Sequence, residues 1–342
     1  MSFEKKLISP RNNEYLFSED KDSVLERGAF GVVYKGIDAK TQEKVAIKRV
    51  CTKEFNPSDE FMKSLGNEVN ILQEMENQKS IVAILDCFQT QEHVNIVMEY
   101  CDGGTLKEKL DKNGNAFTEE EALNYFAEIV EGLYAMHKIG RMHRDLKLEN
   151  IFLKEGGCKI GNFGFATTEL TSSMLIGTPE CMAPEILQCE KGGCYNRQVD
   201  IWSLGIMLHK LLFNDPLPFI GQQQNFEEIL QAIIAKPYQP PAQPFISDFT
   251  KKLLMGMIFV EPKSRFSIDH IKTLLALRTE FISLITQKFD NYRKCCVFFL
   301  SFCVSFLSEM KKKEELAFDD GYLFCCSLLS LAHKKLLSYP PF

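Results

Sequence analysis

The sequence lacks both a long uninterrupted apolar run and an excess of positive charge. Its uncharged runs near the C-terminal end, Cys295 to Ser308 and Gly321 to Ala332, have 14 and 12 residues. A 14-residue helix reaches about 21 Å, short of the ~30 Å hydrocarbon core of a bilayer, so we expect neither run to cross a membrane. Lys and Arg total 40 against 46 Asp and Glu, a net charge of −6. We therefore expect no nucleic-acid partner, because binding to a phosphate backbone requires a basic surface.

The chain also lacks a secretory signal and a zinc-binding cysteine pattern. Its start, MSFEKKLISPRNNEY, has no apolar core of the kind that a signal peptide carries. The 12 cysteines are scattered along the chain, and no pair has the spacing of zinc ligands. We expect reduced thiols, most of them buried as small apolar side chains, and a cytoplasmic location.

Short strand-like runs and one amphipathic helix organise residues 15–101. Apolar residues recur at three- and four-residue spacing from Glu60 to Met75, which predicts the helix. β-Branched residues mark the clearest strands, which are Val32 to Tyr34, Val45 to Ile47 and Val94 to Met98.

Residues from about 118 to 280 are predicted to be mostly helical. Thr118 and the glutamates after it form a capping-box start, and helices resume after Ser247. Gly156-Gly157 lies between two short apolar runs and predicts a β-hairpin. These patterns indicate an α+β fold with a small β-rich lobe, a larger helical lobe and a ligand site in the cleft between them.

The two ends differ in character from this central region. Residues 1–14 are predicted to be an N-terminal extension, and residues 281–342 an apolar, cysteine-rich helical tail. Three interpretations of the tail stay open: short helices packed on the larger lobe or on a partner, membrane attachment, or a poorly folded extension. Cys295-Cys296 and Cys325-Cys326 lie beside apolar runs, as acylated cysteines can, which favours membrane association.

A glycine turn and a lysine at a strand end are the first residues that indicate chemistry. Gly28 and Gly31 lack a Cβ, so backbone N–H groups there can approach phosphates. Lys48 ends an apolar strand, and Glu68 lies on the next predicted helix, where it could face that lysine. Taken alone, these residues also fit an ordinary hairpin turn and a solvated surface lysine.

The segment His143-Arg-Asp-Leu-Lys-Leu-Glu-Asn150 is the most specific part of the chain. Its Asp145, Lys147 and Asn150 share one loop ahead of a predicted strand. These residue types suit proton acceptance, neutralisation of a phosphate and metal coordination. Four further motifs follow in order: Gly177-Thr-Pro-Glu, Ala183-Pro-Glu185, Asp200-Ile-Trp-Ser-Leu-Gly205 and Arg265.

In the order and spacing of these motifs, residues 15–280 resemble the eukaryotic protein kinase family, with an N-lobe at 15–101 and a C-lobe at 102–280. Two features are similar to the Ser/Thr branch of the family. One is the lysine in Asp-Leu-Lys, and the other is Gly-Thr-Pro-Glu ahead of Ala-Pro-Glu. Phe163-Gly-Phe-Ala and the stretch from Tyr15 to Gly36 are similar to the autophagy-related unc-51-like kinases. The resemblance implies a bilobal protein kinase fold, ATP with Mg²⁺ or Mn²⁺ as cofactors, and a protein substrate phosphorylated on Ser or Thr.

The resemblance also implies a role for each matching residue. Gly28 and Gly31 would cover the nucleotide phosphates, and Lys48, paired with Glu68, would hold the α- and β-phosphates. Asp145 would be the catalytic base, with Lys147 neutralising the transferring phosphoryl group and Glu185 and Arg265 forming a buried structural ion pair. The adenine would contact Val33, Ala46, Phe152, the gatekeeper Met98 and the hinge from Glu99 to Cys101, and the metal would lie at Asn150 and Asn162.

Two residues depart from the family pattern. Glu26 replaces the first glycine of the glycine-rich loop, where its carboxylate either repels the phosphates or points outward at little cost. Asn162 replaces the aspartate of Asp-Phe-Gly and keeps a carbonyl oxygen without the negative charge that Mg²⁺ prefers. Loss of one such preorganised group costs about 3–4 kcal/mol, or roughly 10²–10³ in turnover.

Two functions therefore stay open. The first is a Ser/Thr protein kinase slowed by Asn162, favoured because Lys48, Glu68, Asp145, Lys147 and Asn150 are all retained. The second is a pseudokinase that acts as a scaffold or allosteric partner, favoured because Asn162 and Glu26 both disturb the phosphate end of the cleft.

The segment between Asn162 and Glu185 is rich in Ser and Thr. A phosphate on Ser172 or Ser173 would pair with Arg144 and order this segment, as in a regulated kinase. The alternative is that these residues simply form a polar loop.

Overall fold

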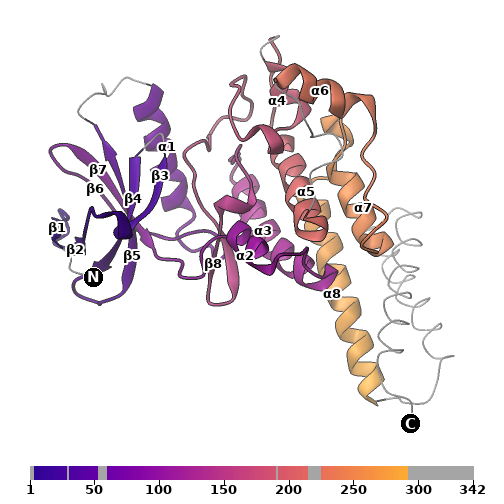
Figure 1. The fold of residues 1–342 in the computed structure, drawn as a ribbon, viewed down its shortest axis with the longest axis horizontal. Coiled ribbons are helices and arrows are strands. Elements are labelled where there is room, and N and C mark those ends of the chain that lie inside the picture. Colours follow the sequence, from indigo (N-terminus) through magenta and orange to yellow (C-terminus); the bar gives the residue numbers. More distant parts are fainter. Residues whose placement is uncertain (1–3, 29–30, 53–59, 190–191, 215–224, 292–342) are drawn as a thin grey trace.

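The computed structural model describes residues 4–28, 31–52, 60–189, 192–214 and 225–291 (Figure 1). The strands are β1 (Lys5–Ile8), β2 (Glu14–Phe17), β3 (Val24–Gly28), β4 (Gly31–Asp38), β5 (Lys44–Cys51), β6 (Ile84–Gln89), β7 (His93–Glu99), β8 (Ile151–Lys154) and β9 (Gly157–Ile160). The helices are α1 (Glu60–Glu74), α2 (Leu106–Asn113), α3 (Glu119–Lys138), α4 (Pro184–Leu187), α5 (Gln198–Phe213), α6 (Phe226–Ala235), α7 (Asp248–Met257) and α8 (Ile268–Asn291).

The N-lobe is one antiparallel sheet with a single long helix beside it (Figure 1). Its strand order is β1-β2-β4-β5-β7-β6, and β3 pairs with the other half of β4. The three predicted strands correspond to β4, β5 and β7, and the predicted helix corresponds to α1. The predicted α+β architecture, with a small β-rich lobe and a larger helical lobe, is confirmed.

The sheet begins within the residues that we expected to be an extension. β1 pairs with β2 in register from Lys5↔Phe17 to Ile8↔Glu14. Tyr15 and Phe17 on β2 are only 2% and 1% exposed, and they pack with Tyr34, Val45 and others in a small second core on this sheet. The N-terminal strands therefore contribute to the folding of the N-lobe.

The C-lobe consists of helices around the buried helix α5. Thr118 caps α3 through a reciprocal capping box with Glu121, as the sequence predicts. The predicted hairpin is β8 and β9, which pair from Ile151↔Ile160 to Lys154↔Gly157. Helix α8 extends past residue 280, the predicted end of the domain, to Asn291.

One continuous hydrophobic core joins the two lobes. Leu72 of α1, Ile84 of β6 and Phe163 belong to it and are 1%, 8% and 1% exposed. The ring of His143, fully buried, lies 5.3 Å from the ring of Phe163. Buried side chains of both lobes thus belong to one connected core.

The predicted tail falls largely outside the described residues, which end at Asn291. Within the described ranges, no helix is both long enough and apolar enough to cross a membrane.

Candidate active site

Lys48 and Glu68 form a buried ion pair between the sheet and α1. Lys48 Nζ lies 2.6 Å and 2.7 Å from the two carboxylate oxygens of Glu68. The side chains are 11% and 4% exposed, so the pair is buried. The pairing predicted from the sequence is therefore present.

Two further contacts attach α1 to the C-lobe. Ser64 donates from its hydroxyl to the carbonyl oxygen of Gly164 at 2.9 Å. Arg141, just ahead of the catalytic loop, binds both carboxylate oxygens of Glu74 at 2.7 Å and 3.0 Å. Together with the Lys48–Glu68 pair, these contacts join α1 both to the sheet and to the C-lobe.

Asp145 lies at the centre of a polar cluster in the catalytic loop. Its Oδ1 accepts from the Thr178 hydroxyl at 2.7 Å, and its Oδ2 lies 3.1 Å from Lys147 Nζ. Lys147 also donates to Thr178 Oγ1 at 2.7 Å. Sequence analysis gave no role to Thr178, although its Gly-Thr-Pro-Glu motif was recognised.

Asn150 and Asn162 bond to each other. Asn150 Nδ2 donates to the backbone oxygen and Oδ2 of Asp145 at 2.7 Å and 3.1 Å, so its own Oδ1 faces Asn162. Asn162 Nδ2 then donates to that oxygen at 3.0 Å. Asn162 has φ of +60°, a left-handed conformation that asparagine tolerates better than most residues.

This pair of amides fits a divalent cation poorly. Mg²⁺ prefers charged oxygen ligands, whereas both amides are neutral and the Asn150 oxygen already accepts from Asn162. Among the described residues, no group of three or more His, Cys, Asp or Glu side chains could hold a metal ion.

Asp200 holds the backbone of the catalytic loop in place through hydrogen bonds. Its carboxylate accepts from the backbone N–H groups of His143 at 3.0 Å and Arg144 at 2.8 Å, and from His137 Nε2 at 2.9 Å. Burial alone would raise the pKa of Asp200, but the bond and charge of His137 and the Arg144 N–H hold that pKa below its usual range. These contacts stabilise Arg144 in a left-handed conformation with φ of +68°. The sequence motif contained Asp200 but did not indicate this role.

His143 is held neutral beneath the site. Burial lowers its pKa, partly offset by the charges of Asp200 and Asp145. Its Nε2 bonds to the carbonyl oxygen of Gly161 at 3.2 Å, and its Nδ1 accepts the Asp145 N–H at 3.3 Å.

The predicted hinge is attached to the C-lobe by Glu99. Its carboxylate lies 2.8 Å from Lys154 Nζ and 2.9 Å from Lys159 Nζ on the β8–β9 hairpin, and accepts the Ala83 N–H at 2.8 Å. Burial alone would raise the pKa of Glu99, but Lys154, the Ala83 N–H and Lys159 hold it below its usual range. Burial and the Glu99 charge raise the pKa of Cys101 to about 12.

The residues predicted to contact adenine come from both lobes. Val33 on β4, Ala46 on β5, Met98 on β7 and Phe152 on β8 are all half-buried. Ala46 pairs directly with Met98 across neighbouring strands.

At the glycine turn, Gly28 on β3 pairs with Gly31 on β4. Gly31 has φ of +136°, and a Cβ there would lie 2.3 Å from the carbonyl oxygen of Arg49, so this position requires glycine. Glu26 on β3 is exposed.

Arg144 reaches from the catalytic loop into the activation segment. It donates to the Phe165 carbonyl oxygen at 2.6 Å and to the Ser172 hydroxyl at 2.9 Å. Ser172 is only 6% exposed and exchanges backbone hydrogen bonds with Tyr195, whereas Ser173 is exposed. Arg144 thus contacts the unmodified Ser172, and phosphorylation of Ser172 or Ser173 stays a prediction.

The predicted structural ion pair is also formed. Arg265 binds both carboxylate oxygens of Glu185 at 2.6 Å and 2.8 Å, and its guanidinium carbon lies 5.1 Å from the centre of the Trp202 ring.

Comparison with known proteins agrees with this geometry. Residues 20–274 match the model of the protein kinase domain family. CBL-interacting protein kinase 16 of rice is 34% identical over 255 residues, which cover 72% of this chain and 54% of that protein. Myosin light chain kinase A of Dictyostelium discoideum is 33% identical over 267 residues, covering 75% of this chain and 86% of that protein.

A third relative, serine/threonine-protein kinase 33 of the mouse, is 32% identical over 267 residues, covering 72% of this chain and 52% of that protein. The matched part of the chain thus corresponds to about half the length of the rice and mouse relatives. The matched region spans both lobes and every motif of the candidate site, from the glycine turn to Arg265. The chain belongs to the protein kinase family, in its serine/threonine branch.

Proposed function

We propose that this protein transfers the γ-phosphoryl group of ATP to serine or threonine hydroxyls of a protein substrate, at a rate limited by Asn162. The arrangement around Asp145 carries this proposal, because it brings a carboxylate, Lys147 and a hydroxyl within bonding distance in one loop. A chain that had lost catalysis would have no chemical need for this cluster.

In the proposed reaction, the bond between the γ-phosphorus and the oxygen bridging it to the β-phosphate breaks, and ADP leaves. A new bond forms from the substrate hydroxyl oxygen to phosphorus, and the hydroxyl proton passes to Asp145. Lys147, 3.1 Å from that carboxylate, lies where it can neutralise the transferring group.

The nucleotide is proposed to lie between the lobes. Lys48, oriented by Glu68, would bind the α- and β-phosphates, with Gly28 and Gly31 covering them. The half-buried side chains of Val33, Ala46, Met98 and Phe152 would contact adenine, and the hinge backbone at Glu99 and Cys101 would bond to its edge.

Asn162 is proposed to lower turnover. Without the aspartate charge, a cation that balanced the phosphates would have only the neutral amide oxygens of Asn150 and Asn162 as ligands, and these two amides bond to each other. Losing one preorganised electrostatic group costs about 3–4 kcal/mol, or roughly 10²–10³ in rate.

A pseudokinase is the second candidate, and the Asn162–Asn150 hydrogen bond favours it. At the position where the family holds a metal, this bond instead joins two neutral amides. In this alternative, the ordered lobes and the buried Lys48–Glu68 pair would serve a scaffold or allosteric function.

We also infer that the protein acts in the cytoplasm, as the reduced state of its thiols supports. The cysteines of the described ranges are all free, and Cys158, Cys181 and Cys189 are buried.

Transfer of labelled γ-phosphate by the purified protein, with Mg²⁺ and with Mn²⁺, tests the proposal. Asp145→Ala should abolish transfer, and Asn162→Asp should raise it about a hundredfold. Asn162→Ala is the matched control, because it removes the amide without adding a charge and should not raise the rate.

If wild-type transfer equals that of Asp145→Ala with both metals, and Asn162→Asp does not restore it, the pseudokinase is correct and the kinase proposal is wrong. Thermal unfolding of each variant verifies that a loss of transfer is not a loss of fold.

A further inference from the structure

Ser64 on α1 donates its hydroxyl proton to the backbone of a turn in the other lobe. The acceptor is the carbonyl oxygen of Gly164 at 2.9 Å, 100 positions further along the chain. A serine inside a helix can instead donate to the carbonyl oxygen four residues back, or to water. The single proton of Ser64 is directed away from its own helix, so it joins α1 to the segment that carries Asn162.

The turn that accepts this bond is closed by the Ala166 N–H, which donates to the Phe163 carbonyl oxygen at 2.9 Å. The carbonyl oxygens of its two central residues, Gly164 and Phe165, take no part in that bond and need other donors. Helix α1 supplies one donor at 2.9 Å, and the Arg144 side chain supplies the other at 2.6 Å. The turn is therefore held by α1 and by the catalytic loop.

Ser64 shares one face of α1 with two residues that join the helix to the rest of the protein. Residues four apart are neighbours on a helix surface, so Ser64, Glu68 and Leu72 form one row. Glu68 binds Lys48 at 2.6 Å and 2.7 Å. Leu72 is 1% exposed in the core that also contains Phe163. This row places the turn relative to the Lys48–Glu68 pair.

Helix α1 contains a residue that makes such contacts important. Gly66 lies exposed in the helix interior, and a Cβ there would meet nothing within 4 Å. Glycine in a helix interior is destabilising relative to alanine, because it loses more backbone freedom on folding. No close approach requires this glycine, so α1 depends on its tertiary contacts more than on its own propensity.

We propose that Ser64 is a positioning residue that holds the turn from Phe163 to Ala166, and with it Asn162, against α1. The identity of residue 162 explains the need for this contact. An aspartate here could gain a cation as a second anchor, whereas the neutral amide of Asn162 is a poor ligand for one. Hydrogen bonds of the protein itself therefore fix this segment before any nucleotide binds.

The effect of Ser64 on turnover rests on the proposed function, but its effect on the turn does not. The hydroxyl bonds to a backbone oxygen rather than to a residue of the catalytic cluster, so it acts through the position of Asn162. If the protein transfers phosphate, Ser64→Ala should lower kcat by about three- to tenfold, the value of one hydrogen bond. The KM for ATP should stay unchanged.

Hydrogen–deuterium exchange on the full chain, without nucleotide, tests the inference directly. The amides to follow are those of Ala166, which closes the turn, and Thr167, which donates to the Met142 carbonyl oxygen at 3.0 Å. Ser64→Ala should speed their exchange by about three- to tenfold, because the turn opens more often without this bond. Ser64→Thr keeps the hydroxyl and should exchange at the wild-type rate.

Gly66→Ala separates positioning of the turn from stability of the helix. Alanine has a higher helix propensity than serine, so Ser64→Ala by itself favours the helical state of α1. Faster exchange in Ser64→Ala would thus report the lost bond and not a melted helix. The double variant of Ser64→Ala with Gly66→Ala should stabilise α1 further and leave exchange at the turn as fast as in Ser64→Ala.

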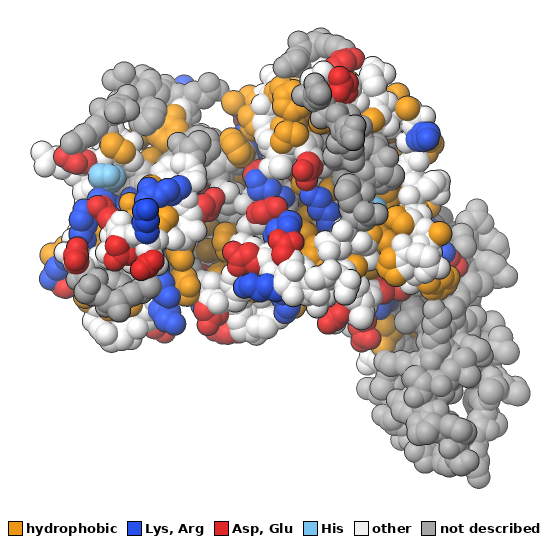
Figure 2. Space-filling view, in the orientation of Figure 1, with side chains coloured by type: hydrophobic (Ala, Val, Ile, Leu, Met, Phe, Trp, Pro, Cys, Tyr) orange, Lys and Arg blue, Asp and Glu red, His pale blue; other side chains and the backbone are white. Residues whose placement is uncertain are grey.

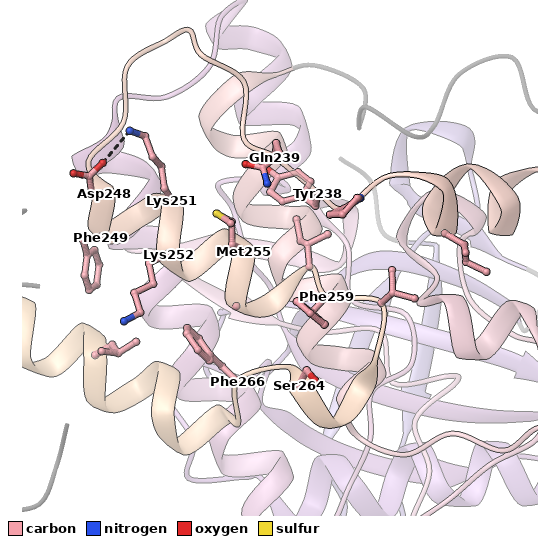
Figure 3. Close-up of a pocket in the computed structure, with 16 residues that line it drawn as sticks. Tyr238, Gln239, Asp248, Phe249, Lys251, Lys252, Met255, Phe259, Ser264 and Phe266 are labelled. Atoms are coloured by element: carbon pink, nitrogen blue, oxygen red, sulfur yellow. Dashed lines mark hydrogen bonds and ion pairs between the residues drawn. The ribbon is translucent and has the colours of Figure 1, made fainter. Parts of the chain in front are cut away.

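Two control variants lie away from this contact. Lys63→Ala replaces the exposed neighbour of Ser64 on α1. Met255→Ala changes a side chain that is 41% exposed in an apolar groove of about 700 Å³ between α6, α7 and α8 (Figure 3). Hydrophobic side chains gather over α7 in the space-filling view (Figure 2). Neither control should change exchange at the turn.

Three results would overturn the inference. One is equal exchange at the turn in the wild type and in Ser64→Ala. Another is exchange in Ser64→Thr that is as fast as in Ser64→Ala, which excludes the hydroxyl as the cause. The last is a return of wild-type exchange in the double variant, which assigns the effect to helix stability.

Failure of the proposed function would look different. In that case wild-type phosphate transfer would equal that of Asp145→Ala, while exchange at the turn would still separate Ser64→Ala from the wild type and from Ser64→Thr. The positioning role would then stand without the catalytic one.

Discussion

The side-chain amide of Asn162 donates to Oδ1 of Asn150 at 3.0 Å. A carboxylate at position 162 could not make this bond, because an ionised carboxylate only accepts hydrogen bonds. With asparagine at position 162, Oδ1 of Asn150 therefore accepts a hydrogen bond that an aspartate there could not donate.

Nucleotide binding should therefore depend little on divalent cations. For the wild type, we expect the Kd of a fluorescent ATP analogue to change by less than about threefold between EDTA and excess Mg²⁺. In Asn162→Asp, added Mg²⁺ should tighten binding by about tenfold or more, since the restored charge is a preferred Mg²⁺ ligand. Equal metal dependence of the two proteins would contradict this explanation.

The Lys48–Glu68 pair should stabilise the N-lobe as a unit. Removing one partner leaves the other charge buried, which costs about 3–5 kcal/mol. We expect Glu68→Gln and Lys48→Met each to lower the free energy of unfolding in urea. The double variant should lose less than the sum of the two, because no uncompensated charge remains. Additive losses would mean that the two side chains do not interact.

The Thr178 hydroxyl should orient Asp145 and Lys147. Thr178→Val keeps the shape but removes hydrogen bonds to a carboxylate and an ammonium group, worth about 1.5–3 kcal/mol. If the kinase proposal is correct, kcat should fall by roughly tenfold or more while KM for ATP stays unchanged. Thr178→Ser retains the hydroxyl and should restore most of the rate. A change confined to KM would instead assign Thr178 to nucleotide binding.

The Glu99 contacts should give a pH-dependent contribution to stability. The pKa of Glu99 is below its ordinary value of 4.5 in the folded protein, so its ionised form stabilises the fold above that pH. This contribution is lost as pH falls below 4.5 and through the folded pKa. Near pH 7, Glu99→Gln should reduce the free energy of unfolding by about 1–2 kcal/mol. The difference from the wild type should shrink as pH falls below 4.5, and a constant difference would contradict the assignment.

Cys101 should be slow to react although it lies at the hinge. The thiolate is the reactive form of cysteine. With a pKa of about 12, the ionised fraction of Cys101 at neutral pH is roughly 10³-fold smaller than that of an ordinary cysteine. Iodoacetamide at pH 7.5 should alkylate the exposed Cys51 and Cys194 well before Cys101. Peptide mapping over time measures the order in which the cysteines are alkylated. Equal alkylation rates would contradict the raised pKa of Cys101.

The local elements could be predicted from sequence because each depends on neighbours along the chain. Apolar spacing predicts α1, Thr118 with Glu121 predicts the start of α3, and Gly156-Gly157 predicts the hairpin. The pairing of Lys48 with Glu68 was predicted from the strand end and the next helix, and the motif order predicted the family.

The remaining contacts join residues far apart in sequence and leave no local pattern. Thr178 meets Asp145 across 33 positions, and Lys154 meets Glu99 across 55. The Asn162–Asn150 bond depends on how each amide is rotated, which the donors and acceptors around it determine. The pairing of β2 with β4, from Tyr15↔Asp38 to Phe17↔Gly36, likewise joins strands that are not consecutive in the chain.

The edge strands also determine where the chain can be shortened. A protein cut to the family-matched residues 20–274 would lose β1 and β2, and with them Tyr15 and Phe17. Tyr34, Val45 and Phe88 would then lose the two aromatic rings that share their core. The part of β4 that pairs with β2, Gly36 to Asp38, would become an unpaired strand edge, which favours aggregation. The buried carboxylate of Asp86 would also lose the hydrogen bonds that it accepts from the Tyr15 hydroxyl and the Asn13 amide. Shortened versions intended for crystallisation or assays should therefore begin ahead of Lys5.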